Sequence, residues 1–293
     1  MALHMISEAN RCLNCKNPQC MAACPVSTCI PEFRLPKSIL DRYKQRLLEM
    51  GIQIRPNTTL GGALHVDDLF RDGYSSVFIG TGTWRPKTLG LPGESYANVH
   101  FGISYLANPS AYTLGETVAV IGMGNVAMDV ARTAFRHGAR RVMLFARRKV
   151  VAASDEEVSF AKLDGAEFFF GRIIQRFTRE GPVFRVAIYD ENGELVGYEE
   201  EPELIHADST IVAVSQGPKD KLLLTTAGLA ANSRGLLLVD KNGMTTREGV
   251  FAAGDVVHGS MTVVHAVADA KVAADAMIRY MEKDYQAYRA GEE

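Results

Sequence analysis

The feature that most constrains the fold is an apolar run followed by two closely spaced glycines and an amphipathic stretch. Residues 117–121 predict a buried strand, Gly122 and Gly124 follow it, and residues 126–137 have the apolar spacing of a helix. Residues 141–145 predict a second strand, which completes a βαβ unit of about 30 residues. Two strands joined by a helix are parallel, so the chain is expected to have an α/β fold.

The Gly-x-Gly turn has the chemistry of a dinucleotide site. Gly122 permits the tight turn, and Gly124 lets the backbone approach a pyrophosphate. The helix N-terminus at Asn125 and Val126 offers free N–H groups to the same phosphates. Ala127 stands where a third glycine is usual and still allows close helix packing. The alternative is a turn with a purely structural role.

A run of three cations follows the second strand. An acidic residue at this place would bind the ribose 2′-hydroxyl, but the chain has Arg147, Arg148 and Lys149. Guanidinium groups suit a 2′-phosphate, so the pattern favours NADPH over NADH. A solvated basic turn is the alternative interpretation.

All five cysteines of the 293 residues lie between Cys12 and Cys29. Such crowding indicates metal or redox chemistry in a reducing, cytoplasmic compartment rather than disulfides. Cys12, Cys15, Cys20 and Cys24 form the candidate metal-binding set, and the proline directly after Cys24 is typical of iron–sulfur ligation. Zinc or free thiols are the other possibilities.

The overall charge gives no sign of nucleic-acid binding, because 32 basic residues face 34 acidic ones and the net charge is −2. The chain has no uninterrupted apolar run of membrane-spanning length and no export signal at its start. We therefore expect small-molecule chemistry in the cytoplasm, with no membrane partner.

Further elements follow from apolar periodicity and turn residues. Strands are expected at 52–55, 76–80, 210–214 and 250–253, helices at 37–50, 154–163 and 261–282, mostly loop at 83–113, and a hairpin over 168–197 that turns at 191–193.

The cysteine segment, with Ile30-Pro31-Glu32-Phe33 after it, resembles the N-terminal cluster domain of the small subunit of NADPH-dependent glutamate synthase and its relatives. The resemblance continues over nearly the whole chain. It includes Arg34-Leu-Pro-Lys37, Phe78-Ile-Gly-Thr-Gly82, Leu91-Pro-Gly-Glu94, the Gly122 motif, Arg147-Arg148, Gln216-Gly-Pro218 and Val250-Phe-Ala-Ala-Gly-Asp255.

This resemblance implies a Rossmann-like NADPH-binding domain at 112–220, inserted in an FAD-binding domain made of 37–111 and 221–293, after a cysteine-rich segment at 1–36. It implies an NADPH-dependent oxidoreductase that passes hydride from NADPH to FAD and electrons to iron–sulfur clusters and a larger partner subunit. No side chain is expected to act as a catalytic acid or base.

The resemblance also assigns cofactor-binding residues. Gly254 and Asp255 would hold the ribityl and pyrophosphate region of the flavin, although an ordinary exit from a strand would have the same pattern. Thr262 and Val263 would open a helix that faces the flavin ring. The remaining assignments are Gly80, Thr81 and Gly82 at the edge of FAD, and Gln216 and Gly217 in the cofactor site.

One departure from the family is large. The family carries a second Gly-x-Gly-x-x-Gly early in the chain, on the first strand of its FAD domain, and this sequence has none. Ile30-Pro31-Glu32-Phe33 runs straight into Arg34, whereas the family has two separate copies of that tetrapeptide. We therefore expect an incomplete FAD-binding domain that lacks the first strand, its phosphate loop and the later cysteines.

Such a gap would leave apolar strand edges exposed, and pairing with another chain or with a second copy could cover them. The competing interpretation of the whole chain is a non-catalytic NADPH-binding remnant or interaction module that needs a complementing chain. A flavoprotein like thioredoxin reductase ranks last, because no cysteine follows Cys29.

Overall fold

The computed structural model describes residues 37–190 and 194–290. The chain divides into two compact units. The middle unit is Trp84–Gly217, and the flanking unit combines the residues up to Thr83 with those from Pro218 onward. Each unit is described by itself.

The middle unit is built on a five-stranded parallel sheet in the order β3-β11-β4-β5-β6. Val118 of β4 lies opposite Val142 of β5 and Ser209 of β11, so the first strand of the βαβ unit is central. The strands are β3 (Val99–Phe101), β4 (Thr117–Ile121), β5 (Arg141–Ala146), β6 (Glu167–Phe170) and β11 (Ser209–Val212).

Alternation along β4 divides its side chains between two cores. Val118 and Val120 pack with the helices on one face, whereas Ala119 and Ile121 belong to the core on the other face. Both faces are buried, which explains the continuous apolar runs of these strands. The helical layer consists of α6 (Gly102–Ala107), the 3-10 turn η1 (Pro109–Ala111), α7 (Asn125–Arg136) and α8 (Asp155–Leu163).

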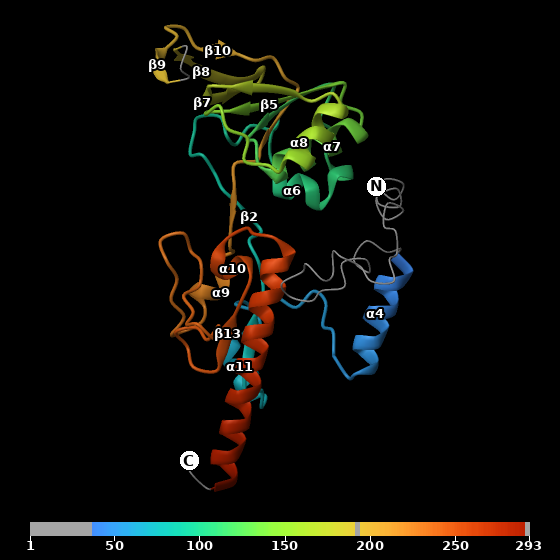
Figure 1. Ribbon diagram of the computed structural model, residues 1–293, viewed down its shortest axis with the longest axis vertical. Helices are drawn as coiled ribbons and strands as arrows, with labels where there is room; N and C mark the ends of the chain where they lie inside the picture. The colour runs from blue at the N-terminus through green and yellow to red at the C-terminus, as the bar shows by residue number, and fades with distance from the viewer. Residues whose placement is uncertain (1–36, 191–193, 291–293) are drawn as a thin grey trace. The chain divides into compact units, whose positions relative to one another are not determined.

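An antiparallel sheet covers the other face of the parallel sheet (Figure 1). The Phe145 ring of β5 stacks on Phe184 with 4.6 Å between centroids and on Phe169 with 5.1 Å. Phe169 belongs to β6 of the same sheet, so the contact with Phe184 of the antiparallel sheet is the one that joins the two sheets through aromatic burial. The antiparallel strands are β7 (Arg172–Thr178), β8 (Gly181–Tyr189), β9 (Leu195–Tyr198) and β10 (Glu203–Leu204).

The middle unit begins at Trp84, whereas we expected the NADPH-binding domain to begin at residue 112. The reason is that β3 pairs with β11, which draws the preceding residues into this unit. A short antiparallel pair of β2 (Arg85–Pro86) and β12 (Gln216–Gly217) brings the two ends of the unit together.

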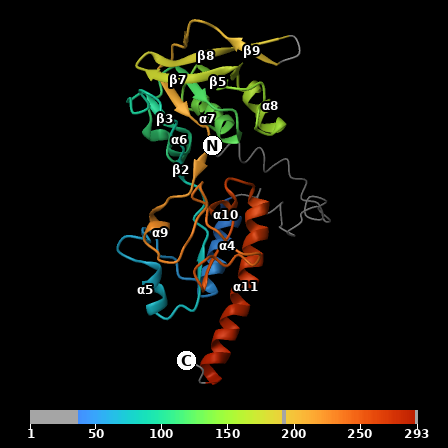
Figure 2. The same cartoon turned by 90° about the vertical axis from the view of Figure 1, so that its left-hand side faces the viewer.

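The flanking unit contains a parallel pair of strands, β1 (Val77–Ile79) and β13 (Val250–Ala252). α11 (Val263–Ala290), the long helix of this unit in Figures 1 and 2, packs against β13, where the Phe251 and Tyr280 rings meet edge to face at 5.9 Å. The other described helices of the flanking unit are α4 (Lys37–Glu49), α5 (Val66–Arg71), α9 (Lys221–Leu224) and α10 (Asp255–His258).

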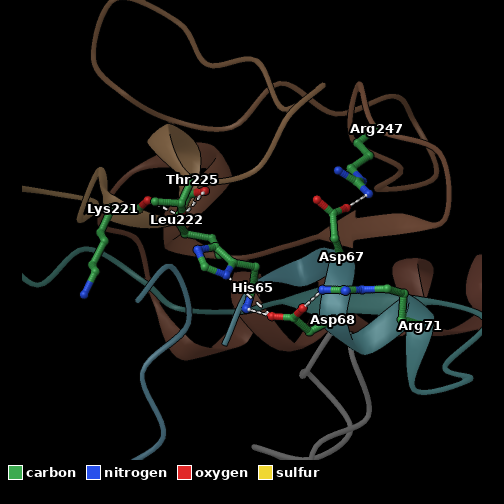
Figure 3. Close-up of polar contacts among 8 residues, drawn as sticks. All are labelled: His65, Asp67, Asp68, Arg71, Lys221, Leu222, Thr225 and Arg247. Atoms are coloured by element: carbon green, nitrogen blue, oxygen red, sulfur yellow. Dashed lines mark hydrogen bonds and ion pairs between the residues drawn. The ribbon is translucent and has the colours of Figure 1, made fainter. Parts of the chain in front are cut away.

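Polar contacts hold α5 to the rest of the flanking unit (Figure 3). The His65 N–H donates to Asp68 Oδ2 at 2.7 Å and so satisfies a backbone donor at the start of the helix. Asp67 pairs with Arg247, whose guanidinium also donates to the Ala227 carbonyl at 2.9 Å.

Most of the predicted elements are confirmed, and three expectations were wrong. Residues 52–55 form no strand, and Ile52 and Ile54 are about half exposed. The expected loop at 83–113 contains β2, β3 and α6, which are too short to show periodicity. The expected hairpin is divided, because residues 167–170 pair in parallel with β5 and Gly171, at φ +68°, turns the chain into β7. The predicted turn at 191–193 lies outside the described residues.

A buried cation links α7 to α8. Arg132 Nε donates to Asp164 at 3.0 Å, Nη1 lies 3.3 Å from a Glu157 oxygen, and the guanidinium lies 4.8 Å from the Phe160 ring centroid. Only 9% of the Arg132 side chain is exposed, whereas about a third of each carboxylate is.

Replacing this cation should therefore destabilise the middle unit. Arg132→Met leaves two partly buried carboxylates without their cation, and we expect a loss of about 1–3 kcal/mol in unfolding free energy, measured by urea denaturation. Arg140→Met is the matched control, because Arg140 pairs with Glu116 at 3.3 Å in a mostly exposed position. Equal effects of the two substitutions would contradict this assignment.

Candidate functional site

Close packing against the protein's own backbone requires a glycine at position 122. Its φ is +131°, and a Cβ atom there would lie 2.3 Å from the Ala213 carbonyl oxygen. The Gly122 N–H donates to the Phe145 carbonyl at 2.9 Å, and the Ala213 N–H donates to Ile121 at 2.8 Å. The turn after β4 is thus held between the carboxyl ends of β5 and β11.

Gly124 meets a different requirement. It has φ −93°, which any residue can adopt, and a Cβ atom there would have no atom within 4 Å. Gly124 is the N-cap of α7, and no side chain caps this helix. The N–H groups of Asn125 and Val126 lie in the first turn, where a helix supplies no acceptor of its own. Open space in front of free donors fits a phosphate group.

The turn also lies where ligands bind in open α/β sheets. The chain continues from β4 to β5 and β6 on one side, whereas β11 and β3 lie on the other side. Gly122 therefore stands at the carboxyl edge where the strand order reverses, which is the position where open α/β sheets bind their ligands.

The cationic loop, residues 147–149, is tied to the glycine turn by the segment that follows it. The N–H groups of Ala152 and Ala153 donate to the Met123 carbonyl at 2.9 and 3.0 Å. The Ser154 N–H donates to Asn125 Oδ1 at 3.0 Å. The Asn125 side chain therefore joins the glycine turn to the start of α8, a role that the sequence did not reveal.

The three cations of the loop are exposed to solvent. Among the residues that the structure describes, no carboxylate forms an ion pair with Arg147, Arg148 or Lys149. Acidic residues elsewhere in the unit, such as Glu157 and Asp164, already bind Arg132. The loop consequently presents concentrated positive charge next to the glycine turn, as an anionic ligand requires.

One carboxyl group of α7 has a shifted pKa. Burial raises the pKa of Asp129, Glu157 raises it further, and Arg132 and Arg136 act in the opposite direction. Asp129 is the last residue of the predicted motif, and its charge is coupled to the contacts between α7 and α8.

Gln216 and Gly217 form β12, where Gln216 lies opposite Pro86 of β2. The chain reaches them directly from Ala213, which packs on Gly122. Ser215 has a φ of +148°, so the backbone between β11 and β12 is strained. The two residues therefore lie on the segment that leaves the glycine turn.

The predicted flavin residues gather at one edge of the flanking unit. Because β1 and β13 are parallel, the segment 80–82 and the pair Gly254-Asp255 both follow carboxyl ends of the same small sheet. Thr83 Oγ1 and Ser260 Oγ lie 3.0 Å apart, and this contact draws the segment 80–83 toward the start of α11.

The start of α11 completes this edge. Gly254 has φ +74°, and a Cβ atom there would lie 3.3 Å from Ala266 Cβ, so the turn after β13 lies against α11. Thr262 Oγ1 is 2.7 Å from His265 Nδ1, and Val263 is the first residue of the helix. Asp255 Oδ1 accepts a hydrogen bond from the Met261 N–H at 3.2 Å.

This edge is less complete than the site in the middle unit. In the described part of the flanking unit, the parallel sheet contains β1 and β13 alone. α10, which follows Gly254, has only four residues, so it offers little of the N-terminal field that holds a pyrophosphate. The structure thus brings the predicted flavin residues together without a phosphate loop.

The candidate metal ligands Cys12, Cys15, Cys20 and Cys24 lie outside the described residues. Within the residues that the structure does describe, no group of three or more metal-binding side chains occurs. No helix in the same residues has the length and apolarity needed to cross a bilayer.

Sequence analysis missed Tyr189 of β8. Its hydroxyl lies 3.3 Å from the Arg147 carbonyl oxygen, although 42 positions separate the two residues. Such a contact depends on how the antiparallel sheet meets the parallel one, and no local motif announces it.

Two family models match the chain. Residues 61–270 match the pyridine nucleotide-disulphide oxidoreductase family, and residues 2–41 match the 4Fe-4S cluster domain II of dihydropyrimidine dehydrogenase. The first match covers parts of both units, and the second contains the four candidate cysteine ligands.

Curated relatives include glutamate synthase small chains. The NADPH-dependent protein of Halomonas elongata is 32% identical over 283 residues, which cover 86% of this chain and 59% of the relative. The Azospirillum brasilense protein is 30% identical and covers 88% and 59%. The β subunit of an NADP(+)-dependent formate dehydrogenase from Moorella thermoacetica is 32% identical, with 87% and 38% covered. The chain therefore matches little more than half the length of the glutamate synthase relatives.

Solved structures share the fold at low identity. Mycobacterium tuberculosis FprA in complex with NADPH superposes with a TM-score of 0.64 at 17% identity and covers 87% of this chain and 74% of that one. Thioredoxin reductase of T. acidophilum gives 0.55 at 22% identity, with 71% and 66% covered. The chain therefore belongs to the pyridine nucleotide-disulphide oxidoreductase family and, over most of its length, is similar to glutamate synthase small chains.

Proposed function

We propose that this chain is an NADPH-dependent oxidoreductase subunit whose middle unit binds NADPH. The observation that carries the proposal is the pairing of two features at one sheet edge. The open glycine turn supplies space and backbone donors for a pyrophosphate. The segment 152–154, which follows the cationic loop, is hydrogen-bonded to that same turn through Met123 and Asn125.

Each part of the site has its own task. Gly124, Asn125 and Val126 would present backbone N–H groups to the pyrophosphate, and Arg147 and Arg148 would pair with the 2′-phosphate. Guanidinium groups bind phosphate in two-point contacts, which NADH cannot form at that position because it carries a hydroxyl there. Gln216 and Gly217 would border the site on the far side of the turn.

The flanking unit supports a role for FAD. The segments 80–82 and 254–255 and the start of α11 meet at one edge, in the arrangement that the resemblance assigns to the flavin. With both cofactors bound, the nicotinamide would supply hydride to the flavin, and electrons would leave one at a time through iron–sulfur centres. The N-terminal match to a 4Fe-4S domain supports those centres at Cys12, Cys15, Cys20 and Cys24. Cysteine ligands of this kind suit a cytoplasmic protein.

The partner would be a larger electron-accepting subunit. The relatives reported above include the small chain of one enzyme and the β subunit of another. The outer edge of β1 has no partner strand among the described residues, and an unpaired edge is a ready site for strand addition. A second copy of the chain could cover the same edge.

This open edge also favours a second candidate function. If nothing supplies the missing strand and phosphate loop, FAD lacks donors for its pyrophosphate and the chain would be an NADPH-binding module without catalysis. The middle unit would remain intact in that case, because its central strand and glycine turn are present.

The two glycines should respond differently to alanine. Gly122→Ala places Cβ against the Ala213 carbonyl at a positive φ, and we expect a loss of about 1–3 kcal/mol in unfolding free energy. Gly124→Ala should keep wild-type stability and weaken NADPH binding about tenfold, because the methyl group enters the space for phosphate. Urea denaturation and fluorescence titration with NADPH measure both effects. Unchanged NADPH affinity in Gly124→Ala would contradict the site.

Cofactor preference should depend on the cationic loop. The double variant Arg147→Ala/Arg148→Ala is expected to lose about 10- to 100-fold in NADPH affinity and less than about threefold in NADH affinity. Arg140→Ala/Arg179→Ala removes the same charge from exposed positions outside the site and serves as the control. An unchanged ratio of the two nicotinamide affinities would refute the assignment.

Flavin binding distinguishes the oxidoreductase from the second candidate function, an NADPH-binding module without catalysis. We expect FAD added to the purified full chain to bind, to show oxidised flavin absorption, and to bleach when NADPH is added without oxygen. Asp255→Ala should weaken FAD binding while NADPH affinity stays unchanged, because the two residue sets belong to different units. A chain that binds NADPH but no added FAD would favour the second candidate function.

A further inference from the structure

The Tyr189 ring packs against the backbone of Gly171, where a side chain would leave it no room. Gly171 has φ +68°, and a Cβ atom there would lie 2.9 Å from Tyr189 Cε2. The Tyr189 ring therefore rests directly on the backbone of the turn between β6 and β7. The Ala187 N–H donates to the Gly171 carbonyl at 2.8 Å and keeps this turn against β8. This hydrogen bond fixes the turn against which the ring packs, and so the ring has a defined position.

In this position Tyr189 contacts the cationic loop at two points. Its hydroxyl donates to the Arg147 carbonyl oxygen at 3.3 Å. The Lys149 ammonium lies 4.4 Å from the centroid of its ring, within the range of a cation–π interaction. The two contacts lie on either side of Arg148, so one tyrosine restrains both ends of the cationic loop.

A cavity of about 460 Å³ lies beside these contacts. Its lining includes all three cations of the loop, together with Tyr189 and Tyr198. Binding sites for small molecules have volumes of roughly 300–1,000 Å³, so the cavity has room for a nucleoside fragment. The cationic side of the lining suits a phosphate group, whereas the Glu194 carboxylate in the same lining offers it no pairing.

Three adjacent cations repel one another, and a loop that carries them loses conformational freedom when it binds an anion. Contacts that hold the loop in advance reduce this cost. Tyr189 supplies two such contacts, and neither uses a guanidinium group, so both arginines stay available for a ligand.

We propose that Tyr189 is a positioning residue that holds the cationic loop for the 2′-phosphate of the cofactor and thereby contributes to the selection of NADPH. The inference rests on the proposed function and deepens it. The tyrosine acts on the ligand indirectly, through its contacts with Arg147 and Lys149 at the two ends of the cationic loop.

The test compares two probes that differ in one group. Adenosine 2′,5′-bisphosphate carries the 2′-phosphate, and adenosine 5′-monophosphate lacks it. In the full chain, Tyr189→Leu should weaken binding of the bisphosphate about three- to tenfold and leave binding of the monophosphate unchanged, as measured by isothermal titration calorimetry. Tyr189→Phe keeps the ring under Lys149 and should recover at least half of the lost factor.

Tyr198→Leu is the matched control. Tyr198 lines the same cavity and belongs to the same antiparallel sheet, but its ring stacks on Arg185 at 3.4 Å. It should leave the preference for the bisphosphate unchanged. If Tyr198→Leu reduced the preference for the bisphosphate as much as Tyr189→Leu does, the proposal would be overturned, because any change in the cavity wall would then have the same effect.

Two further outcomes separate this inference from the proposed function. A wild-type chain that binds both probes equally would refute NADPH selection itself, and the inference with it. A wild-type chain that prefers the bisphosphate and keeps that preference in Tyr189→Leu, with the thermal unfolding midpoint unchanged, would overturn the role of Tyr189 alone.

Discussion

The close approach of Gly122 to the Ala213 carbonyl is the constraint on which the middle unit depends. It places the turn after β4 directly against the chain leaving β11, where a side chain would collide with the backbone. This contact brings together the central strand, the N-terminus of α7 and the segment that leads to β12. The two faces of the sheet can then be filled independently, by helices on one side and by the antiparallel sheet on the other.

Function in the middle unit follows from what this arrangement leaves free. Gly122 is confined by protein atoms, whereas Gly124 faces open space at the start of a helix without a side-chain cap. Hydrogen bonds from residues 152–154 then bring the cationic loop to the same place. Backbone donors and side-chain cations therefore meet at one edge, although they come from different loops. That combination favours a ligand with a pyrophosphate and one additional phosphate.

Among the described residues, the parallel sheet of the flanking unit has two strands. The pair of β1 and β13 has a core of its own, with Val77, Ile79 and Val250 buried, and it still gathers the residues assigned to the flavin. What the pair lacks in the described residues is a neighbour for the outer edge of β1. Backbone groups on such an edge require a partner, so completeness of this unit is a question about a further chain segment or another protein.

The sequence by itself determined the βαβ unit, the glycine turn and the cationic run, because these depend on periodicity and on residue types a few positions apart. It predicted helix 154–163 and the strands around 117–121 and 141–145, which have strong patterns. It missed β3 and misassigned residues 168–170 within one hairpin, because three- or four-residue strands owe their pairing to distant neighbours. Only the tertiary structure decided that Asn125 bonds to Ser154 and that Tyr189 supports Arg147 and Lys149. Those contacts join residues 29 to 42 positions apart. Packing of α7 beside α8 brings Asn125 to Ser154, and packing of one sheet on another brings Tyr189 to the cationic loop, which no local pattern records.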